Sequence, residues 1–362
     1  MDSRSADPLV LGQRVVAILE TGLRVATYKL ATLMALLEHC VENLPEHHAD
    51  ELVVPIPELA HRVLDIYWPQ IRPFDGRELR QSNDGRSRIL AAANDLRKAA
   101  GLTCRSVDVA QLRAPAAYLR AIAEVGLCLA QQPLHRLQKL PGAAASDAFL
   151  YDDSFLHDKI SRKTLHKHGN AITLKAGVGD GLARLAGLLR PTLEIMWVED
   201  VRRMNRFLDE NVPDVAGHLF GRERSAMAAV REPFKEVFGP HCFYCNAHLP
   251  QDNPIDHVLP WSLVGIDGLA NLVLACARCN GDKTNALPAV RLIDQALDEA
   301  RTGLLTEIAD YLQWPVQRGR VIAAARGIYL GQPQGIPTWD GYRATQRLDV
   351  SFPPPWLRAR AT

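Results

Sequence analysis

The sequence predicts a mainly helical protein with one small α+β module in its C-terminal half. Two observations support this fold class. Long stretches before residue 240 place apolar residues at the three- and four-residue spacing of helices. After that point, two Cys-x-x-Cys pairs flank two short apolar runs that suit strands. The composition agrees, since 47% of the 362 residues are hydrophobic and 23% are charged, as in ordinary globular proteins.

Residues 1–140 are expected to form a helical N-terminal domain. Apolar residues follow a helical spacing from Val15 to Leu44, and Pro45 marks a stop. A second amphipathic stretch has Pro57 in its first turn and ends before Pro69. Two Ala-, Leu- and Arg-rich stretches complete the region, Ser87 to Ala100 and Pro115 to Gln131.

This N-terminal region is the candidate for docking DNA or a protein partner that triggers the protein. A helix-turn-helix between Thr27 and Trp68 would offer one route to DNA. The connection over residues 43–54 is too long for the usual tight turn of that motif, so the helix-turn-helix is the weaker interpretation.

A linker of small residues is predicted over residues 141–150. The middle region that follows, 151–237, holds the densest basic run of the chain, from Lys159 to His168. Two helices broken near Pro191 are expected after this run, and then a helix from about Arg224 to Val237.

The seven cysteines fall into two groups. Three stand singly in the sequence and are expected to be buried small hydrophobic residues, namely Cys40, Cys104 and Cys128. The other four form two pairs with 30 residues between them, namely Cys242, Cys245, Cys276 and Cys279. Two thiolate pairs in a module too small for its own core are typical of a structural Zn²⁺ site. A redox pair at Cys242 is disfavoured because no strand-to-helix entry surrounds it.

Between the cysteine pairs, strands are expected over Ile255–Leu259 and Asn271–Ala275, and a helix starts near Cys276. This order, within a module at 238–290, resembles the HNH endonuclease family with its ββα-metal fold. The residues that carry the resemblance are Asp256, His257, Pro260, Asn271, Leu272, Cys276, Cys279, Asn280 and Lys283. Many members have His where Asn280 stands, so the segment is similar to the HNN branch of the family.

The resemblance implies an endonuclease that hydrolyses phosphodiester bonds in DNA, with double-stranded DNA as the expected partner. His257 would take a proton from water as general base. Asp256 and Asn280 would hold a catalytic divalent ion, and their oxygen donors suit Mg²⁺ or Mn²⁺. Asn271 would support the loop that carries the histidine, and Lys283 would meet a phosphate oxygen.

The net charge of +1 means that any DNA-binding surface is a local patch. The basic run from Lys159 to His168 is one candidate, although such runs are more often a solvated surface. A second candidate is an arginine set interleaved with acids, namely Arg202, Arg203, Arg206, Arg222 and Arg224. No signal peptide or membrane-length apolar run is visible, so a cytoplasmic protein without a membrane partner is expected.

Residues 291–362 are expected to continue a helix from Pro288 to Trp314 and to end in an extended tail. The rival interpretation of the whole chain is a zinc-stabilised module that binds DNA or protein without cleaving it. A zinc scaffold alone needs only the cysteines, so the enzyme is favoured by five further residues together, namely Asp256, His257, Asn271, Asn280 and Lys283. A role in bacterial restriction or antiviral defence is an expectation from the family resemblance.

Overall fold

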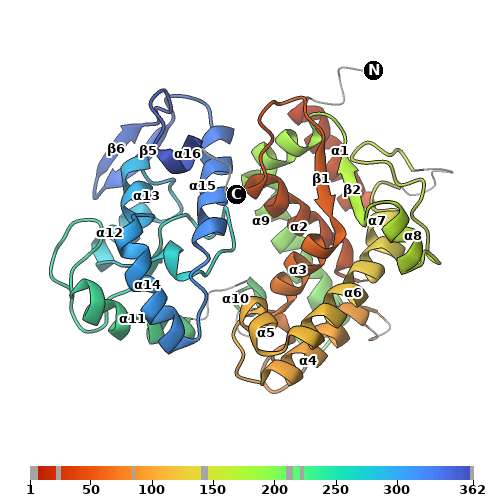
Figure 1. The fold of residues 1–362 in the computed structure, drawn as a ribbon, viewed down its shortest axis with the longest axis horizontal. Helices are drawn as coiled ribbons and strands as arrows, with labels where there is room; N and C mark the ends of the chain where they lie inside the picture. The colour runs from red at the N-terminus through yellow and green to blue at the C-terminus, as the bar shows by residue number, and fades with distance from the viewer. Residues whose placement is uncertain are drawn as a thin grey trace. The chain divides into compact units, whose positions relative to one another are not determined.

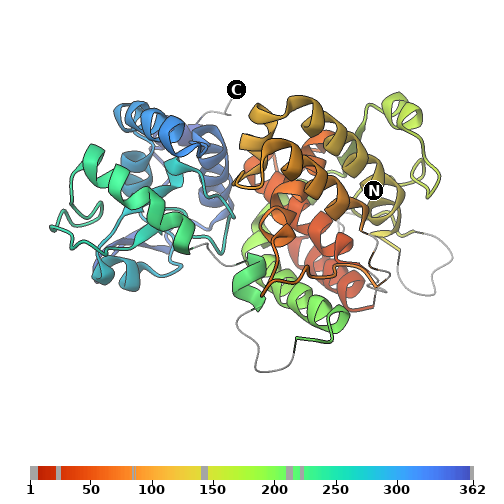
Figure 2. The same cartoon turned by 90° about the horizontal axis from the view of Figure 1, so that it is seen from below.

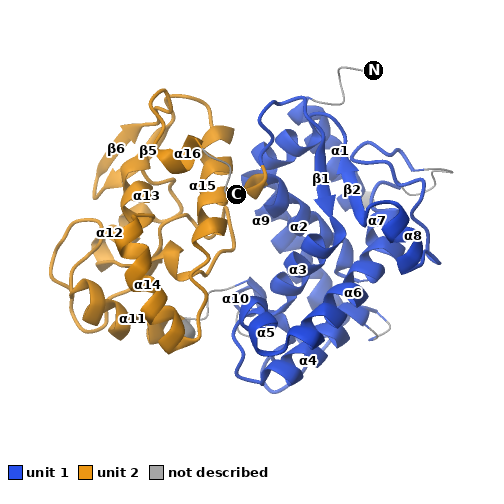
Figure 3. Cartoon of the chain, in the orientation of Figure 1, with its two compact units in different colours: residues 1–40, 44–221 blue, residues 41–43, 222–362 orange. Residues whose placement is uncertain are grey.

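The computed structural model describes residues 7–21, 26–83, 85, 87–139, 146–208, 215–220 and 224–358. The chain divides into two compact units, shown in different colours in Figure 3. Unit 1 comprises residues 1–40 and 44–221, and unit 2 comprises residues 41–43 and 222–362. Helices make up most of the described residues, and the strands there form three two-stranded sheets. This confirms the predicted class of a mainly α protein with a small α+β module.

Unit 1 is built almost entirely of helices. Its helical elements are α1 (Pro8–Thr21), α2 (Tyr28–Glu42), α3 (Ile56–Tyr67), η2 (Pro69–Ile71), α4 (Arg88–Ala100), α5 (Val107–Arg113), α6 (Pro115–Gln131), α7 (Pro133–Arg136), α8 (Arg162–Lys167), α9 (Val178–Met204) and α10 (Val215–Phe220). Helix α6 packs beside α3 and α4, as the two views in Figures 1 and 2 show. Apolar residues spaced three or four apart, such as Leu59 and Val63 of α3, are fully buried and form the core.

A short antiparallel ribbon joins segments of unit 1 that are far apart in the sequence. Strand β1 (Leu52–Pro55) pairs with β2 (Ala171–Leu174), with Leu52 opposite Leu174. The ribbon therefore ties part of the predicted N-terminal range to part of the predicted middle range within one unit.

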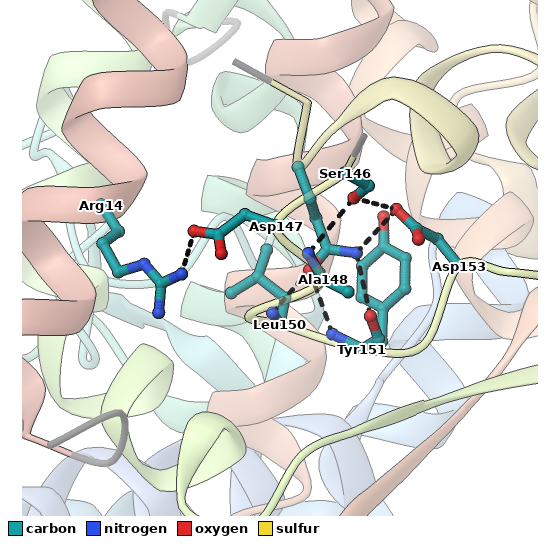
Figure 4. A network of polar contacts seen from close by, with 8 residues as sticks. Arg14, Ser146, Asp147, Ala148, Leu150, Tyr151 and Asp153 are labelled. Atoms are coloured by element: carbon teal, nitrogen blue, oxygen red, sulfur yellow. Dashed lines mark hydrogen bonds and ion pairs between the residues drawn. The ribbon is translucent and has the colours of Figure 1, made fainter. Parts of the chain in front are cut away.

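The side chain of Gln138 anchors the segment that enters this ribbon. Its Oε1 accepts the backbone N–H groups of Leu150 and Tyr151 at 2.6 and 3.2 Å. Its Nε2 donates to the Tyr151 carbonyl at 3.0 Å and to Asp153 at 3.2 Å. Ser146 also donates to Asp153, and Figure 4 shows Ser146, Leu150, Tyr151 and Asp153 within this network of hydrogen bonds. Residues 146–150 of the predicted linker are therefore held in place, whereas 141–145 lie outside the described residues.

The stretch of helical spacing from Val15 to Leu44 is divided in the structure between two helices, α1 and α2. The backbone just before α2 is extended. Ala26 forms a bridge with Ser82, and the N–H of Thr27 donates to the carbonyl of Gln81 at 3.0 Å. These contacts take the chain out of helical geometry before α2 begins.

The break predicted near Pro191 is wrong, since α9 runs through it for 27 residues. Proline removes one N–H and crowds the carbonyl four residues earlier. That earlier residue, Gly187, is exposed, as is Pro191. The released carbonyl can therefore bind water, and buried residues such as Leu189 and Leu193 hold the helix on both sides.

Unit 2 contains the cysteine-rich segment. Its elements are α11 (Arg224–Phe238), β3 (Ile255–His257), η3 (Leu269–Asn271), β4 (Leu272–Leu274), α12 (Ala277–Lys283), α13 (Val290–Ala296), α14 (Glu299–Leu312), α15 (Arg318–Gly331), β5 (Pro337–Gly341), β6 (Ala344–Arg347) and α16 (Pro355–Arg358). Strands β3 and β4 are antiparallel, and α12 follows directly. The predicted strand, strand and helix are thus present.

The C-terminal part of unit 2 differs from the prediction in two places. The helix predicted from Pro288 to Trp314 is divided into α13 and α14, because Asp298 caps α14 by accepting the N–H of Arg301 at 3.1 Å. Helix α15 was not predicted at all. The extended tail is a hairpin of β5 and β6 followed by α16.

Candidate active site

The four paired cysteines meet at one point of unit 2. Cys242 and Cys245 lie in the turn after α11, Cys276 caps α12, and Cys279 lies in its first turn. Their sulfur atoms all lie within 4.8 Å of one another, and those of Cys245 and Cys276 are 3.8 Å apart. Tetrahedral Zn²⁺ with bonds of about 2.3 Å places its sulfur ligands about 3.8 Å apart. The cluster therefore fits a structural zinc site.

The surroundings of the cluster shift the pKa values of its cysteines in different directions. Burial raises the pKa of Cys242, although the backbone N–H of Cys276 donates to its sulfur at 3.3 Å. Desolvation opposes the Cys245 thiolate, but hydrogen bonds from the Ala247 backbone and the other cysteines outweigh it and lower the pKa of Cys245 to about 7. Cys245 is also exposed, so it is the most reactive thiol of the cluster.

Asp256 lies in the middle of β3 and is almost fully buried. Its Oδ2 accepts the Tyr244 hydroxyl at 2.7 Å and lies 3.0 Å from Nζ of Lys283. Desolvation, reinforced by the Asp256 carboxylate, raises the pKa of Tyr244 well above its ordinary value, so the phenol remains a donor. Two groups therefore fix the orientation of this carboxylate.

His257 follows on the same strand and has a different set of partners, as strand alternation requires. Its Nε2 lies 2.7 Å from Oδ1 of Asp267, and its ring centre lies 5.1 Å from that of Trp261. The histidine is completely buried, whereas the Asp267 side chain is 45% exposed. Among the described residues, Nδ1 of His257 has no hydrogen-bond partner. One ring nitrogen is thus held by a carboxylate and the other is unbonded.

Asn271 closes the loop between the two strands. Its Oδ1 accepts the Leu259 N–H at 2.8 Å, and its Nδ2 donates to the carbonyls of Leu259 and Ile266 at 3.3 and 3.1 Å. The indole of Trp314 donates to the Asp267 carbonyl at 2.7 Å. These contacts fix the loop that carries Asp267 and brings it to His257. Asn271 therefore lies where a residue that supports the histidine loop has to lie.

Lys283 differs from the expectation that it meets a phosphate oxygen. Its side chain is 1% exposed, and Nζ donates to the His257 carbonyl at 2.7 Å in addition to its ion pair with Asp256. The enclosed ammonium group therefore holds strand β3 through the backbone of His257 and the side chain of Asp256. Asn280 lies three residues earlier on α12, a spacing that places the two residues on one helix face, and it is partly exposed.

Arg301 of α14 fixes strand β4 from the other side of the module. Its guanidinium donates to the Leu272 carbonyl at 2.6 Å and to the Ala296 carbonyl at 2.9 Å. It also lies over the rings of Phe238 and Phe243 at 5.2 and 6.0 Å. Burial lowers the pKa of Arg301 to about 10. The ββα module is therefore braced by a helix outside it.

Sequence reasoning missed four contributors to this site, namely Tyr244, Asp267, Arg301 and Trp314. Tyr244 lies inside the first cysteine pair, which is a signal that could have been used. Asp267 lies four residues before Asn271, on the loop that this asparagine closes. For Arg301 and Trp314 the sequence carries no signal, since their contacts depend on how α14 packs against the module.

Comparison with known protein families agrees with the two units. Residues 10–218, more than half of the chain, match the family described as Domain of unknown function (DUF8808). The chain belongs to the DUF8808 family. Residues 242–286 of this DUF8808 protein match the HNH endonuclease family, which confirms the resemblance seen in the sequence. Curated proteins and solved structures gave no match.

Apart from residues 41–43, the DUF8808 region lies in unit 1, and the HNH region lies in unit 2. An HNH domain with a four-cysteine metal cluster indicates a nuclease or nucleic-acid-binding function. Among the described helices of the DUF8808 protein, none combines the length and the apolar character that a membrane crossing requires.

Proposed function

We propose that this DUF8808 protein is a metal-dependent endonuclease that hydrolyses phosphodiester bonds in DNA. The observation that carries the proposal is the state of His257 within the residues matched to the HNH family. Its Nε2 is held by Asp267 at 2.7 Å, while Nδ1 has no partner among the described residues. A histidine with one nitrogen oriented and the other unbonded is arranged as a general base.

In the proposed reaction, Nδ1 of His257 accepts a proton from a water molecule, and the oxygen of that water bonds to the phosphorus of the scissile phosphate. The bond between phosphorus and the 3′ oxygen then breaks, and the departing oxygen takes up a proton from solvent. Asp267 stabilises the protonated imidazole through Nε2–H. Because His257 is completely buried, this role requires the groups that cover its Nδ1 atom to move when DNA binds.

Asp256 and Asn280 are the residues that would hold the catalytic divalent ion. Their donors are a carboxylate and a carboxamide, which suit Mg²⁺ or Mn²⁺. When bound, such an ion neutralises charge on the scissile phosphate. The hydrogen bond from Tyr244 to Oδ2 of Asp256, together with the Lys283 ion pair, leaves Oδ1 of Asp256 as the oxygen available to an ion.

The test is plasmid cleavage in the presence of Mg²⁺, Mn²⁺ or EDTA. The proposal expects the wild type to cleave with either ion, and EDTA and His257→Ala each to abolish cleavage. His248→Ala is a matched control, because His248 is an exposed histidine of the same unit. Cleavage by His257→Ala at the wild-type rate would remove the assignment.

A second candidate function, binding without cleavage, is favoured by one observation. The Asp256 carboxylate is enclosed by Tyr244 and Lys283, and His257 is buried, so neither faces solvent in the structure. A gel-shift experiment separates the two functions. Tight binding of duplex DNA by the wild type, with no cleavage under any metal condition, would favour the binding module.

Four finer features belong to the same proposal: double-stranded DNA as substrate, a triggering partner at the N-terminal region, a role in restriction or antiviral defence, and a cytoplasmic location. The basic run supports a nucleic-acid partner, since Lys159, Lys163 and Lys167 are exposed. Arg162 in the same run is paired with Glu124 and adds less charge. A reducing compartment suits the cluster, because its thiols must stay reduced to bind zinc.

A further inference from the structure

A cavity of about 610 Å³ opens in unit 1, within the DUF8808 region. Its walls come from the end of η2, the first two turns of α4 and, between them, residues 72, 78–82, 85 and 87. The volume falls within the range of roughly 300–1,000 Å³ that small-molecule sites occupy. No part of the proposed nuclease chemistry uses this cavity.

Arginines dominate the charge of the lining. Arg72, Arg80 and Arg88 line the cavity, and Glu78 is its one acidic lining residue among those described. The Arg80 guanidinium is exposed and has no partner among the described residues, although Asn205 holds its backbone N–H and carbonyl at 2.8 and 2.9 Å. The base of this side chain is therefore fixed while its charged end is available. A guanidinium of this kind suits phosphate.

Two further features make the lining favourable for an anion. The cavity includes the N-terminal turn of α4, a 13-residue helix whose dipole is positive at that end, although the N–H groups of Ile89 and Leu90 there already donate to the Tyr28 hydroxyl and the Ser87 side chain. Desolvation, with a smaller effect of nearby Arg97, lowers the pKa of Arg72. Because the charged form of Arg72 is disfavoured there, a bound anion would stabilise it. Arg88 adds less, because it is shared with Glu124 and Gln131.

The remaining wall is not charged. Ile71 and Leu79 are 8% and 5% exposed and give it an apolar surface. Asn94 lines the same wall, and its carboxamide has no hydrogen-bond partner among the described residues. The cavity thus combines a cationic end with an apolar side that carries one amide for hydrogen bonding. Inorganic phosphate would use only the first of these parts.

We propose that this cavity binds a nucleoside phosphate, with the phosphates at Arg80 and the α4 N-terminus and the nucleoside against Ile71 and Leu79. The inference goes beyond the proposed nuclease and does not depend on it. A concave site of this volume holds one nucleotide, whereas a duplex presents its phosphates as an extended row.

The test is isothermal titration calorimetry on the full-length chain with ATP, pyrophosphate and adenosine. Saturable binding of ATP is expected, with pyrophosphate and adenosine each weaker by about tenfold or more. Arg80→Ala is expected to weaken ATP binding roughly 10- to 100-fold, as the loss of a hydrogen bond to a charged group does. Asn94→Leu is expected to weaken ATP binding while leaving pyrophosphate unchanged.

Arg136→Ala serves as the matched control, since Arg136 is an exposed arginine of the same unit and does not line the cavity. Circular dichroism checks that each variant is folded. Arg80→Ala is expected to fold normally because the Arg80 side chain is exposed. Three results would overturn the proposal. They are no binding of ATP by the wild type, equal binding by Arg80→Ala and the control, and loss of duplex DNA binding in Arg80→Ala without any nucleotide binding.

Discussion

The carboxylate of Asp267 lies 2.7 Å from Nε2 of the buried His257, ten residues earlier in the chain. The pairing depends on Asn271, whose carboxamide closes the intervening loop at Leu259 and Ile266. A carboxylate in this position selects the tautomer that carries its proton on Nε2. The other nitrogen, Nδ1, is then the one with a free lone pair.

We therefore expect Asp267→Asn to reduce DNA cleavage roughly 10²- to 10⁴-fold, the range of a lost general-base contribution. The amide can donate to Nε2 and so favours the wrong tautomer. The measurement is the single-turnover rate on a plasmid substrate, with DNA affinity measured separately. Asp252→Asn is the control, since the Asp252 side chain is 96% exposed. A variant at Asp267 that cleaves like the wild type would show that the pair is structural only.

A second prediction concerns the enclosed ion pair between Lys283 and Asp256. Removing one partner leaves a buried charge unpaired, which typically costs about 3–5 kcal/mol. Lys283→Met is therefore expected to lower the free energy of unfolding by about this amount. The double variant Asp256→Asn with Lys283→Met is expected to lose less free energy of unfolding than the two single variants lose when their losses are added. Denaturant unfolding measures all three.

The same experiment separates the two roles considered for Lys283. A lysine that meets only a phosphate would leave stability unchanged when it is replaced, and would lower DNA affinity alone. Unchanged unfolding free energy in Lys283→Met would therefore contradict the bracing role. Purely additive effects in the double variant would contradict the coupling to Asp256.

Residue spacing predicted the ββα order, because each of its parts is local. The cysteine pairs mark both ends of the module, and the strands and helix between them are short apolar or helical runs. The Asp267–His257 pair was not predicted, because it depends on the path of the nine residues between them. For Lys283, helix geometry predicts the same face as Asn280, but the sequence does not reveal that β3 encloses the lysine side chain.

Two helix boundaries were predicted wrongly from local signals. The proline at 191 was given too much weight as a helix breaker, and the capping residue Asp298 was given too little. Pro191 does not end α9, because its cost falls on an exposed carbonyl while the packed residues around it maintain the helix. Asp298, two residues after the end of α13, starts α14 through a single cap hydrogen bond. Tertiary packing decided the first case, and a one-residue capping preference decided the second.

A third prediction follows from the cysteine cluster. Purified protein is expected to hold one zinc ion per chain, since four sulfur atoms within 4.8 Å suit one tetrahedral ion. After chelation, Cys245 is expected to react first with iodoacetamide at pH 8. Its thiol is exposed, and its pKa of about 7 makes it mostly thiolate at that pH. Peptide mass spectrometry identifies the modified residue.

Two buried cysteines are internal controls for this reaction. Burial raises the pKa of Cys40 to about 12 and that of Cys128 to about 11, so both remain protonated thiols at pH 8. They are expected to react only after unit 1 unfolds. Reaction of Cys40 before Cys245, or protein that contains no zinc when purified without chelator, would contradict the assignment of the cluster.

The uninterrupted course of α9 leads to a fourth prediction, that Pro191→Ala stabilises unit 1. A proline inside a helix is about 3 kcal/mol less favourable than alanine, although the more flexible unfolded chain of the variant offsets about 0.4–1 kcal/mol of the gain. Since the site is exposed and no packing is lost, an increase of about 2 kcal/mol in the free energy of unfolding is expected. Pro115→Ala is the matched control. Pro115 is exposed at the first position of α6, where proline is favourable, so its replacement is expected to give no gain. Calorimetry of both variants decides the matter, and a lower Tm for Pro191→Ala would show that the proline fits α9 without strain.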